Sequence, residues 1–318
     1  MTILLSILAF FLMIACAEAR QKTITIEHFN FTGSPPDFSV VYGVNKHHAF
    51  NRTSLGQTAA YWTDTNELPN DTRWYDESAA ALTGSGGGTH DWCRSGELIT
   101  FDHEIWRVEA ADGSAARQAT AHKWFVMGTE LKARLPNCLL TFYGYNGSNG
   151  VKDDFTRGTS AVGSGNYTFW QSMNNDLAEI WQAPWDVIAP TFYYSFTRAV
   201  DGPDNVVLYN TWYNALMDEY IRMRTTYGHG QQIRPYIWHK HRAHPGDLTV
   251  TGFLLDTDVW NAAVCTAYRR GDGIMWFTVT NTVWSDTIEW WIHFKQILQD
   301  PNPCGNFEST RSPRSFVP

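Results

Sequence analysis

The sequence is poor in charge and lacks the phosphate-binding motifs of nucleotide enzymes. Only 18% of its 318 residues are charged, and the net charge is −8. An acidic chain repels a polyanionic backbone, which argues against nucleic acid as a partner. No GxGxxG fingerprint opens a strand-to-helix turn, and the Gly-rich stretch 83–90 lacks the Lys-Ser/Thr pair of a phosphate loop. We therefore predict no nucleotide and no other cofactor.

Long apolar runs are absent beyond the first residues. An apolar run from Ile3 to Ala15 ends in small residues, as secretory signal peptides do, and it is too short to span a membrane. We predict a cleaved signal peptide at 1–19, followed by a single domain at 20–318 without stable membrane insertion. The expected location is extracellular, with a lysosome or secretory vesicle as the alternative.

Cysteine is scarce, and no CxxC pair is present, which argues against a structural zinc site. Four cysteines follow the signal peptide: Cys93, Cys138, Cys265 and Cys304. An even number in a secreted chain predicts two disulfides, and all three pairings remain open. Glycosylation sequons stand at Asn30, Asn51, Asn70, Asn146 and Asn166. They fit a glycosylated extracellular protein.

Aromatic residues are abundant, with 15 Trp, 14 Tyr and 18 Phe. One interpretation is a large core, and the other is a cleft lined with flat faces that stack on sugars. Either reading requires a folded chain with a sizeable interior, which the hydrophobic content of 43% supplies.

Segments with strand character alternate with segments of helical periodicity. Strands are predicted at 38–44, 96–105, 138–145, 187–196, 233–241 and 273–281, and helices at 114–135, 174–182, 214–228, 257–271 and 285–300. Such alternation is typical of parallel strands joined by helical crossovers. The predicted fold is therefore α/β, a distorted (β/α) TIM-like barrel of seven or eight parallel strands.

The stretch ELITFDHEIWR (97–107) carries two carboxylates within a buried-type strand. Asp102 and Glu104 are two residues apart and so point to one face, with Thr100 below them. Ile99, Phe101 and His103 point to the other face. Two carboxylates this close cannot both ionise freely, and a protonated acid beside an ionised one suits glycosidic bond cleavage. The alternative is a solvated acidic pair on a surface strand.

ITFDHEIWR resembles the catalytic segment of the hyaluronidase family of glycoside hydrolases, V-I-D-W-E-x-W-R. Asp102, Glu104, Trp106 and Arg107 match it. Further segments resemble the family in the same order: KWFVMGTELKARLPNCLLTFYGY, NNDLAEIWQAPWDVIAPTFYYS and FLLDTDVWNAAVCTAYRRGDGIMW. The resemblance spans residues 96 to 300.

The resemblance implies an endo-β-N-acetylhexosaminidase that hydrolyses β-1,4 bonds of hyaluronan or a related glycosaminoglycan. The predicted signal peptide makes it a secreted protein, and we expect a monomer. Glu104 matches the general acid/base. Asp102 matches the residue that orients the substrate's N-acetyl group, whose carbonyl oxygen is the nucleophile, so that configuration is retained without a covalent enzyme intermediate.

The resemblance also implies substrate-binding residues: Tyr143, Tyr193, Trp276 and Arg107. For the tryptophan, the downstream Asn281 supports Trp276, whereas gapless counting selects Phe277, which points to the opposite face. No metal is expected in the site.

Two features leave the substrate and the function open. The basic stretch IRPYIWHKHRAH (233–244) suits a rim for an acidic glycan, or it is an ordinary solvated loop. The family's Asp after the FYG motif is missing here, which favours a non-catalytic secreted glycan-binding protein. Within enzymes, chondroitin or a neutral N-acetylglucosamine polymer is the alternative substrate.

Overall fold

The structure is a computed structural model of the chain. It describes residues 23–27, 31–32, 45–56, 58–85, 90–103, 105–106, 112–143, 165–194, 205–241, 255, 257–277, 282–287, 289–299 and 304. The predicted signal peptide at 1–19 and the predicted strand at 38–44 lie outside these ranges.

Every strand pairing in the described structure is parallel. The strands are β1 (Thr23–Glu27), β2 (Phe31–Thr32), β3 (Asn45–Asn51), β4 (Leu98–Asp102), β5 (Leu139–Tyr143), β6 (Val187–Ile188), β7 (Thr191–Tyr194), β8 (Gln232–Ile233), β9 (Tyr236–His241), β10 (Gly273–Phe277) and β11 (Thr282–Val283). Seven form one sheet in the order β5-β4-β3-β1-β10-β9-β7, and β11–β2 and β6–β8 form two small sheets.

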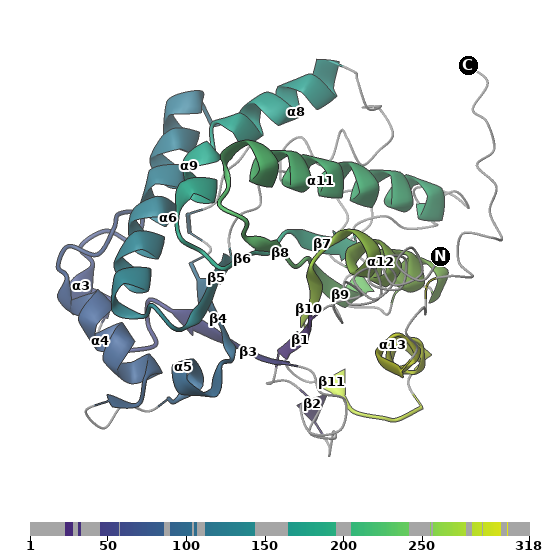
Figure 1. Cartoon of the computed structure of the whole chain (residues 1–318), viewed down its shortest axis with the longest axis horizontal. Coiled ribbons are helices and arrows are strands. Elements are labelled where there is room, and N and C mark those ends of the chain that lie inside the picture. The colour runs from purple at the N-terminus through teal and green to yellow at the C-terminus, as the bar shows by residue number, and fades with distance from the viewer. Residues whose placement is uncertain are drawn as a thin grey trace, which may run out of the picture.

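Helices connect the strands and surround them (Figure 1). They are α3 (Thr58–Tyr61), α4 (Arg73–Leu82), α5 (Trp92–Ser95), α6 (Ser114–Arg134), α8 (Gly165–Asn175), α9 (Ala178–Gln182), α11 (Asn205–Tyr227), α12 (Thr257–Arg270) and α13 (Glu289–Gln299). Parallel neighbours need such crossovers. The α/β class predicted from the sequence is therefore confirmed.

The strands stand around a ring in Figure 1, but the described ladder does not close. The seven-stranded order ends at β5 on one side and β7 on the other. Between them lie β6 and β8, and the Asp186 N–H donates to the Leu140 carbonyl (3.0 Å) where β6 approaches β5. Pro190 follows β6 and Pro235 follows β8, and a proline cannot donate to a ladder. The described residues thus form a mixed α/β fold with parallel strands, and the distorted barrel of seven or eight strands stays a prediction.

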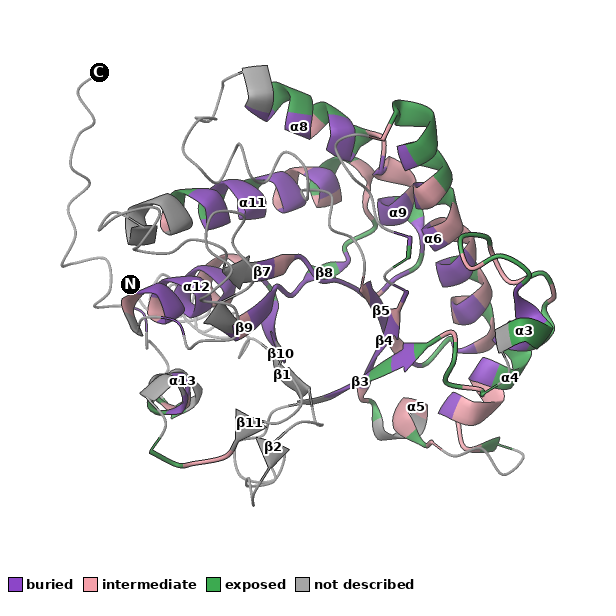
Figure 2. Ribbon diagram, turned by 180° about the vertical axis from the view of Figure 1, so that it is seen from behind, coloured by how far each residue is buried: buried purple, intermediate pink, exposed green. Residues whose placement is uncertain are grey.

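Aromatic side chains fill the space between the strands and the surrounding helices. Trp74, Trp124, Trp185 and Phe142 are each at most 2% exposed and belong to one continuous core. Figure 2 shows buried residues on the strands and on the strand-facing sides of the long helices. The aromatic abundance of the sequence is therefore largely a core property.

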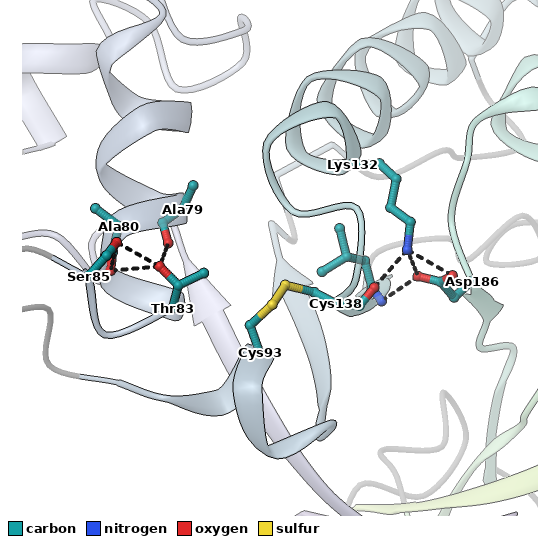
Figure 3. The surroundings of a disulfide bond; sticks show 9 residues. Ala79, Ala80, Thr83, Ser85, Cys93, Lys132, Cys138 and Asp186 are labelled. Atoms are coloured by element: carbon teal, nitrogen blue, oxygen red, sulfur yellow. Dashed lines mark hydrogen bonds and ion pairs between the residues drawn. A yellow bond between two sulfur atoms is a disulfide. The ribbon is translucent and has the colours of Figure 1, made fainter.

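Two disulfides are present, Cys93–Cys138 and Cys265–Cys304. The first joins α5 to the residue before β5 (Figure 3). Beside it, Lys132 Nζ donates to the Cys138 carbonyl (2.7 Å) and pairs with the Asp186 carboxylate (2.7 Å). One of the three pairings left open by the sequence is thereby selected.

Several elements differ from the predictions, and these are the clearest cases. β3 occupies 45–51, where no strand was predicted. The helix predicted at 174–182 is divided into the end of α8 and the separate α9, and α11 starts nine residues before the predicted 214.

None of the helices in the described part of the chain combines the length and the apolar character needed to cross a bilayer.

Candidate active site

β4 presents two different faces, as its sequence predicts. Thr100 is buried and hydrogen-bonds to side chains of β3 and β9 across the ring, so it faces inward. Phe101 packs outward against Phe50 (5.6 Å between ring centroids) and Trp74 (6.2 Å). Because strand side chains alternate, Asp102 shares the inner face with Thr100. It is half-buried at the carboxyl end of the strand.

Tyr143 stands beside Asp102 at the end of the neighbouring strand. The two residues are direct partners in the β4–β5 register. The His103 N–H donates to the Tyr143 carbonyl (3.5 Å), which extends the ladder past Asp102. The Tyr143 ring meets the edge of Tyr236 at 5.5 Å with an interplanar angle of 87°. Two of the predicted site residues are thus brought together at the carboxyl end of the ring.

A buried polar trio lies below this pair. The hydroxyls of Thr100 and Tyr236 are 2.9 Å apart, and the Tyr236 hydroxyl is 3.2 Å from His47 Nε2. His47 Nε2 also hydrogen-bonds to Thr100 Oγ1. All three side chains are at most 3% exposed. The trio fixes the Tyr236 ring, and that ring in turn supports Tyr143.

Burial keeps His47 uncharged. Burial, together with the smaller effect of the adjacent His48, lowers the pKa of His47 to about 3. His47 Nδ1 is buried and has no hydrogen-bond partner among the residues that the structure describes, so a proton there would place an unsolvated charge in the interior. The trio is therefore uncharged at neutral pH. It supports the site through its hydrogen bonds and does not act as a proton donor.

His103, the residue that follows Asp102, packs among aromatic side chains outside the ring. His103 Nε2 donates to the Thr65 carbonyl (3.4 Å), and its ring packs against Trp62 and Trp106 at 5.7 and 4.3 Å between centroids. Burial lowers the pKa of His103 to about 4. Trp106 is itself buried, and its carbonyl accepts from Trp124 Nε1 (3.3 Å).

Glu104 and Arg107 lie outside the described residues. In the chain, Glu104 stands two residues from each of two described anchors, Asp102 and Trp106. The predicted juxtaposition of Glu104 with Asp102 stays a prediction from strand periodicity.

Trp276 is not brought together with Asp102 and Tyr143. It is 0% exposed and packs between β10 and α13, with its ring 6.2 Å from Trp291 and 5.0 Å from Phe294. A side chain enclosed in this way has no surface to offer a sugar, so the placement of Trp276 in the site is corrected. The gapless alternative, Phe277, pairs with Trp238 in the register, and its side chain lies outside what the structure describes.

Tyr193 belongs to β7 and directly follows Phe192, whose buried ring stacks outward on Tyr213 at 4.3 Å. The Tyr193 side chain lies outside what the structure describes.

Two residues of the predicted basic rim, Arg234 and His239, are buried. Arg234 is 3% exposed at the amino end of β9, and burial lowers its pKa to about 10. His239 is 0% exposed and accepts from Trp276 Nε1 (3.4 Å) in the outer core. Arg242 and His244 lie outside the described residues, as do the side chains of Lys240 and His241. Within the described residues this stretch is largely structural.

The described side chains include no group of three or more His, Cys, Asp or Glu placed to hold a metal ion. The sequence reasoning missed other site residues: His47, Tyr236 and the exposed Asn51, which pairs with Asp102 in the β3–β4 register. The consecutive histidines of KHHAF were the available signal, because polar residues within a buried strand have to be satisfied by partners.

Comparisons with known proteins give a distant likeness among solved structures. No protein-family model matches the chain, and no curated protein matches it. Among solved structures, the chain is similar to bee venom hyaluronidase, crystallised in complex with a hyaluronic acid tetramer. The two are 13% identical at a TM-score of 0.49, over 88% of this chain and 98% of that one. Likeness at this level establishes neither membership of a family nor an activity.

Proposed function

We propose that this protein is a secreted, retaining endo-β-N-acetylhexosaminidase of hyaluronidase type. The observation that carries the proposal is the pairing of Asp102 with Tyr143 on the inner face, at the carboxyl ends of adjacent parallel strands. Enzymes built on rings of parallel strands keep their chemistry at that end. The sequence around Asp102 is the second support, because Asp102, Glu104, Trp106 and Arg107 match the catalytic segment of the hyaluronidase family.

In the proposed mechanism, Glu104 protonates the leaving glycosidic oxygen and then activates water. Asp102 orients the N-acetyl group so that its carbonyl oxygen attacks the anomeric carbon. The nucleophile belongs to the substrate, so the two carboxylates need no space between them for another attacking group. Tyr143, held from below by Tyr236, contacts the sugar at the scissile bond.

The proposal extends to the rest of the chain. Arg107 and Tyr193 are assigned to substrate binding. Residues 20–318 form one domain, a distorted (β/α) barrel, released as a monomer after removal of residues 1–19.

Hyaluronan or a related glycosaminoglycan is the proposed substrate. With Arg234 and His239 buried, the described part of the basic stretch does not supply a cationic rim. A chain of net charge −8 then has little general attraction for an acidic polymer. Chondroitin and neutral N-acetylglucosamine polymers therefore belong in the same test.

The test is product release from oligomers of hyaluronan, chondroitin and chitin, at acidic and at neutral pH. Glu104→Gln keeps the size of the side chain and removes the transferable proton, so turnover should fall by about 10² to 10⁴-fold. The matched control is Glu130→Gln on α6, outside the ring, whose carboxylate pairs with Arg134 one turn further along the same helix (2.6 Å). It should hydrolyse like the wild type.

Unchanged hydrolysis by Glu104→Gln would refute the assigned acid/base. Binding without cleavage by the wild type would favour a glycan-binding protein, the function to which the missing Asp after FYG points.

A further inference from the structure

Asn51 stands at the rim of the proposed active site. It is the last residue of β3 and the direct register partner of Asp102. His47 faces inward on the same strand, so alternation places positions 49 and 51 on that face as well. Ala49 and Asn51 are both exposed, and the inner face of β3 is therefore open to solvent toward its carboxyl end.

The Asn51 side chain is held with its oxygen engaged and its nitrogen available. Oδ1 accepts from the Thr53 N–H (2.9 Å), the Thr53 hydroxyl (2.6 Å) and the Ser54 hydroxyl (3.3 Å). The Asn51 N–H donates to Ser54 Oγ (2.9 Å), which closes the turn. Within the described structure Nδ2 makes no hydrogen bond.

Asn51, Arg52 and Thr53 form an N-x-T sequon in which the two functional residues already contact each other. We propose that Asn51 carries an N-linked glycan that stands over the rim of the ring beside Asp102 and restricts how large polysaccharides enter. The attachment requires passage through the secretory pathway but does not require that the protein be a hydrolase. Its consequence for access to substrate rests on the proposed function.

The covalent step needs a lipid-pyrophosphate-linked oligosaccharide as the donor. Asn51 Nδ2 attacks the anomeric carbon of the donor's terminal N-acetylglucosamine. The bond from that carbon to the pyrophosphate oxygen breaks, lipid pyrophosphate leaves with the electron pair, and Nδ2 loses one proton. Nothing is oxidised or reduced.

The spacing between neighbouring strands places a glycan on Asn51 close to Asp102. Neighbouring strands lie about 4.8 Å apart, so the first sugar on Asn51 lies within one side-chain length of Asp102. Asn70 offers a contrast. It is also an exposed sequon asparagine, but it precedes α4, which packs against α6 outside the ring. A glycan on Asn70 leaves the rim open.

The first measurement is occupancy of Asn51 in protein purified from the medium of eukaryotic cells. Amidase release in heavy-oxygen water converts a glycosylated asparagine to a labelled aspartate, which peptide mass spectrometry detects. We expect the label at position 51 in the wild type and in Thr53→Ser, which keeps the sequon. Thr53→Ala, which removes it, should give none. An unmodified Asn51 in the secreted wild type overturns the proposal, whether or not the protein is a hydrolase.

The second measurement reports shielding without relying on activity. Ala49→Cys places a thiol on the exposed inner face of β3, two residues from the glycan. A polyethylene-glycol maleimide should label it slowly, and several-fold faster after amidase treatment, while a small maleimide reacts equally in both states. Equal labelling by the large reagent before and after treatment shows that the glycan does not cover the rim, and overturns the proposal.

Discussion

The inner and outer faces of the ring are built from the same strands but from different chemistry. On β4, Phe101 contributes to a buried aromatic shell, whereas Thr100 and Asp102 stand on the inner face, where Thr100 hydrogen-bonds to His47 and Tyr236. On β3, Phe50 and His47 divide in the same way. Successive residues of each strand therefore serve different purposes: one side chain packs into the stabilising outer shell, and the next faces the proposed site.

The outer face should carry the largest share of stability. Trp124 is 0% exposed and touches the rings of Trp106, Phe142 and Trp185. Trp124→Ala should lower the free energy of unfolding by about 3 to 5 kcal/mol, measured by denaturant titration. The neighbouring Phe125 is only half-buried, and Phe125→Ala should cost clearly less. Equal losses would show that the shell is not the stabilising face.

Acid should weaken both faces through their buried histidines. The pKa is about 3 for His47 and about 4 for His103, against about 6.5 in the unfolded chain. Between these values the unfolded state binds more protons, so the free energy of unfolding falls as the pH falls below about 6.5. Each histidine contributes about 1.4 kcal/mol for each pH unit.

The check is a series of denaturant titrations from neutral pH to about pH 4.5. His47→Asn should reduce the slope by close to one proton. A slope unchanged by His47→Asn would mean that His47 titrates normally in the folded protein.

The buried trio of His47, Thr100 and Tyr236 should contribute least to the free energy of unfolding. Tyr236→Phe removes the hydroxyl shared with Thr100 and His47, and should lower the free energy of unfolding by about 1 kcal/mol. Tyr75→Phe is the matched control, because the Tyr75 hydroxyl makes no hydrogen bond in the described structure. Equal effects of the two substitutions would argue that the trio is not a stabilising unit.

How much the sequence could predict depends on how apolar each strand is. β4 and its two faces were predictable because LITF is a run of apolar and β-branched residues that ends at Asp102. β3 was missed because NKHHAFN does not alternate: four polar residues precede Ala49 and Phe50, and the histidines are buried by means of distant partners, Thr100 and Glu97. Such tertiary hydrogen bonds leave no local pattern.

Trp276 was misplaced for a different reason. A spacing that is one residue short reverses every side chain downstream, and sequence alone offers two alignments. The structure decides for the outer face, since Trp276 meets Trp291 and Phe294.

The most direct test compares two adjacent residues of β4, with activity and stability measured on the same samples. Asp102→Asn should lower hydrolysis of the preferred oligosaccharide by about 10²-fold or more, because the substrate is no longer oriented, and leave the free energy of unfolding nearly unchanged. Phe101→Leu should cost about 1 to 3 kcal/mol in stability and keep the activity of the folded molecule. If Asp102→Asn stays fully active, or if both variants lose activity only in proportion to unfolding, the inner face is not the active site and the account is wrong.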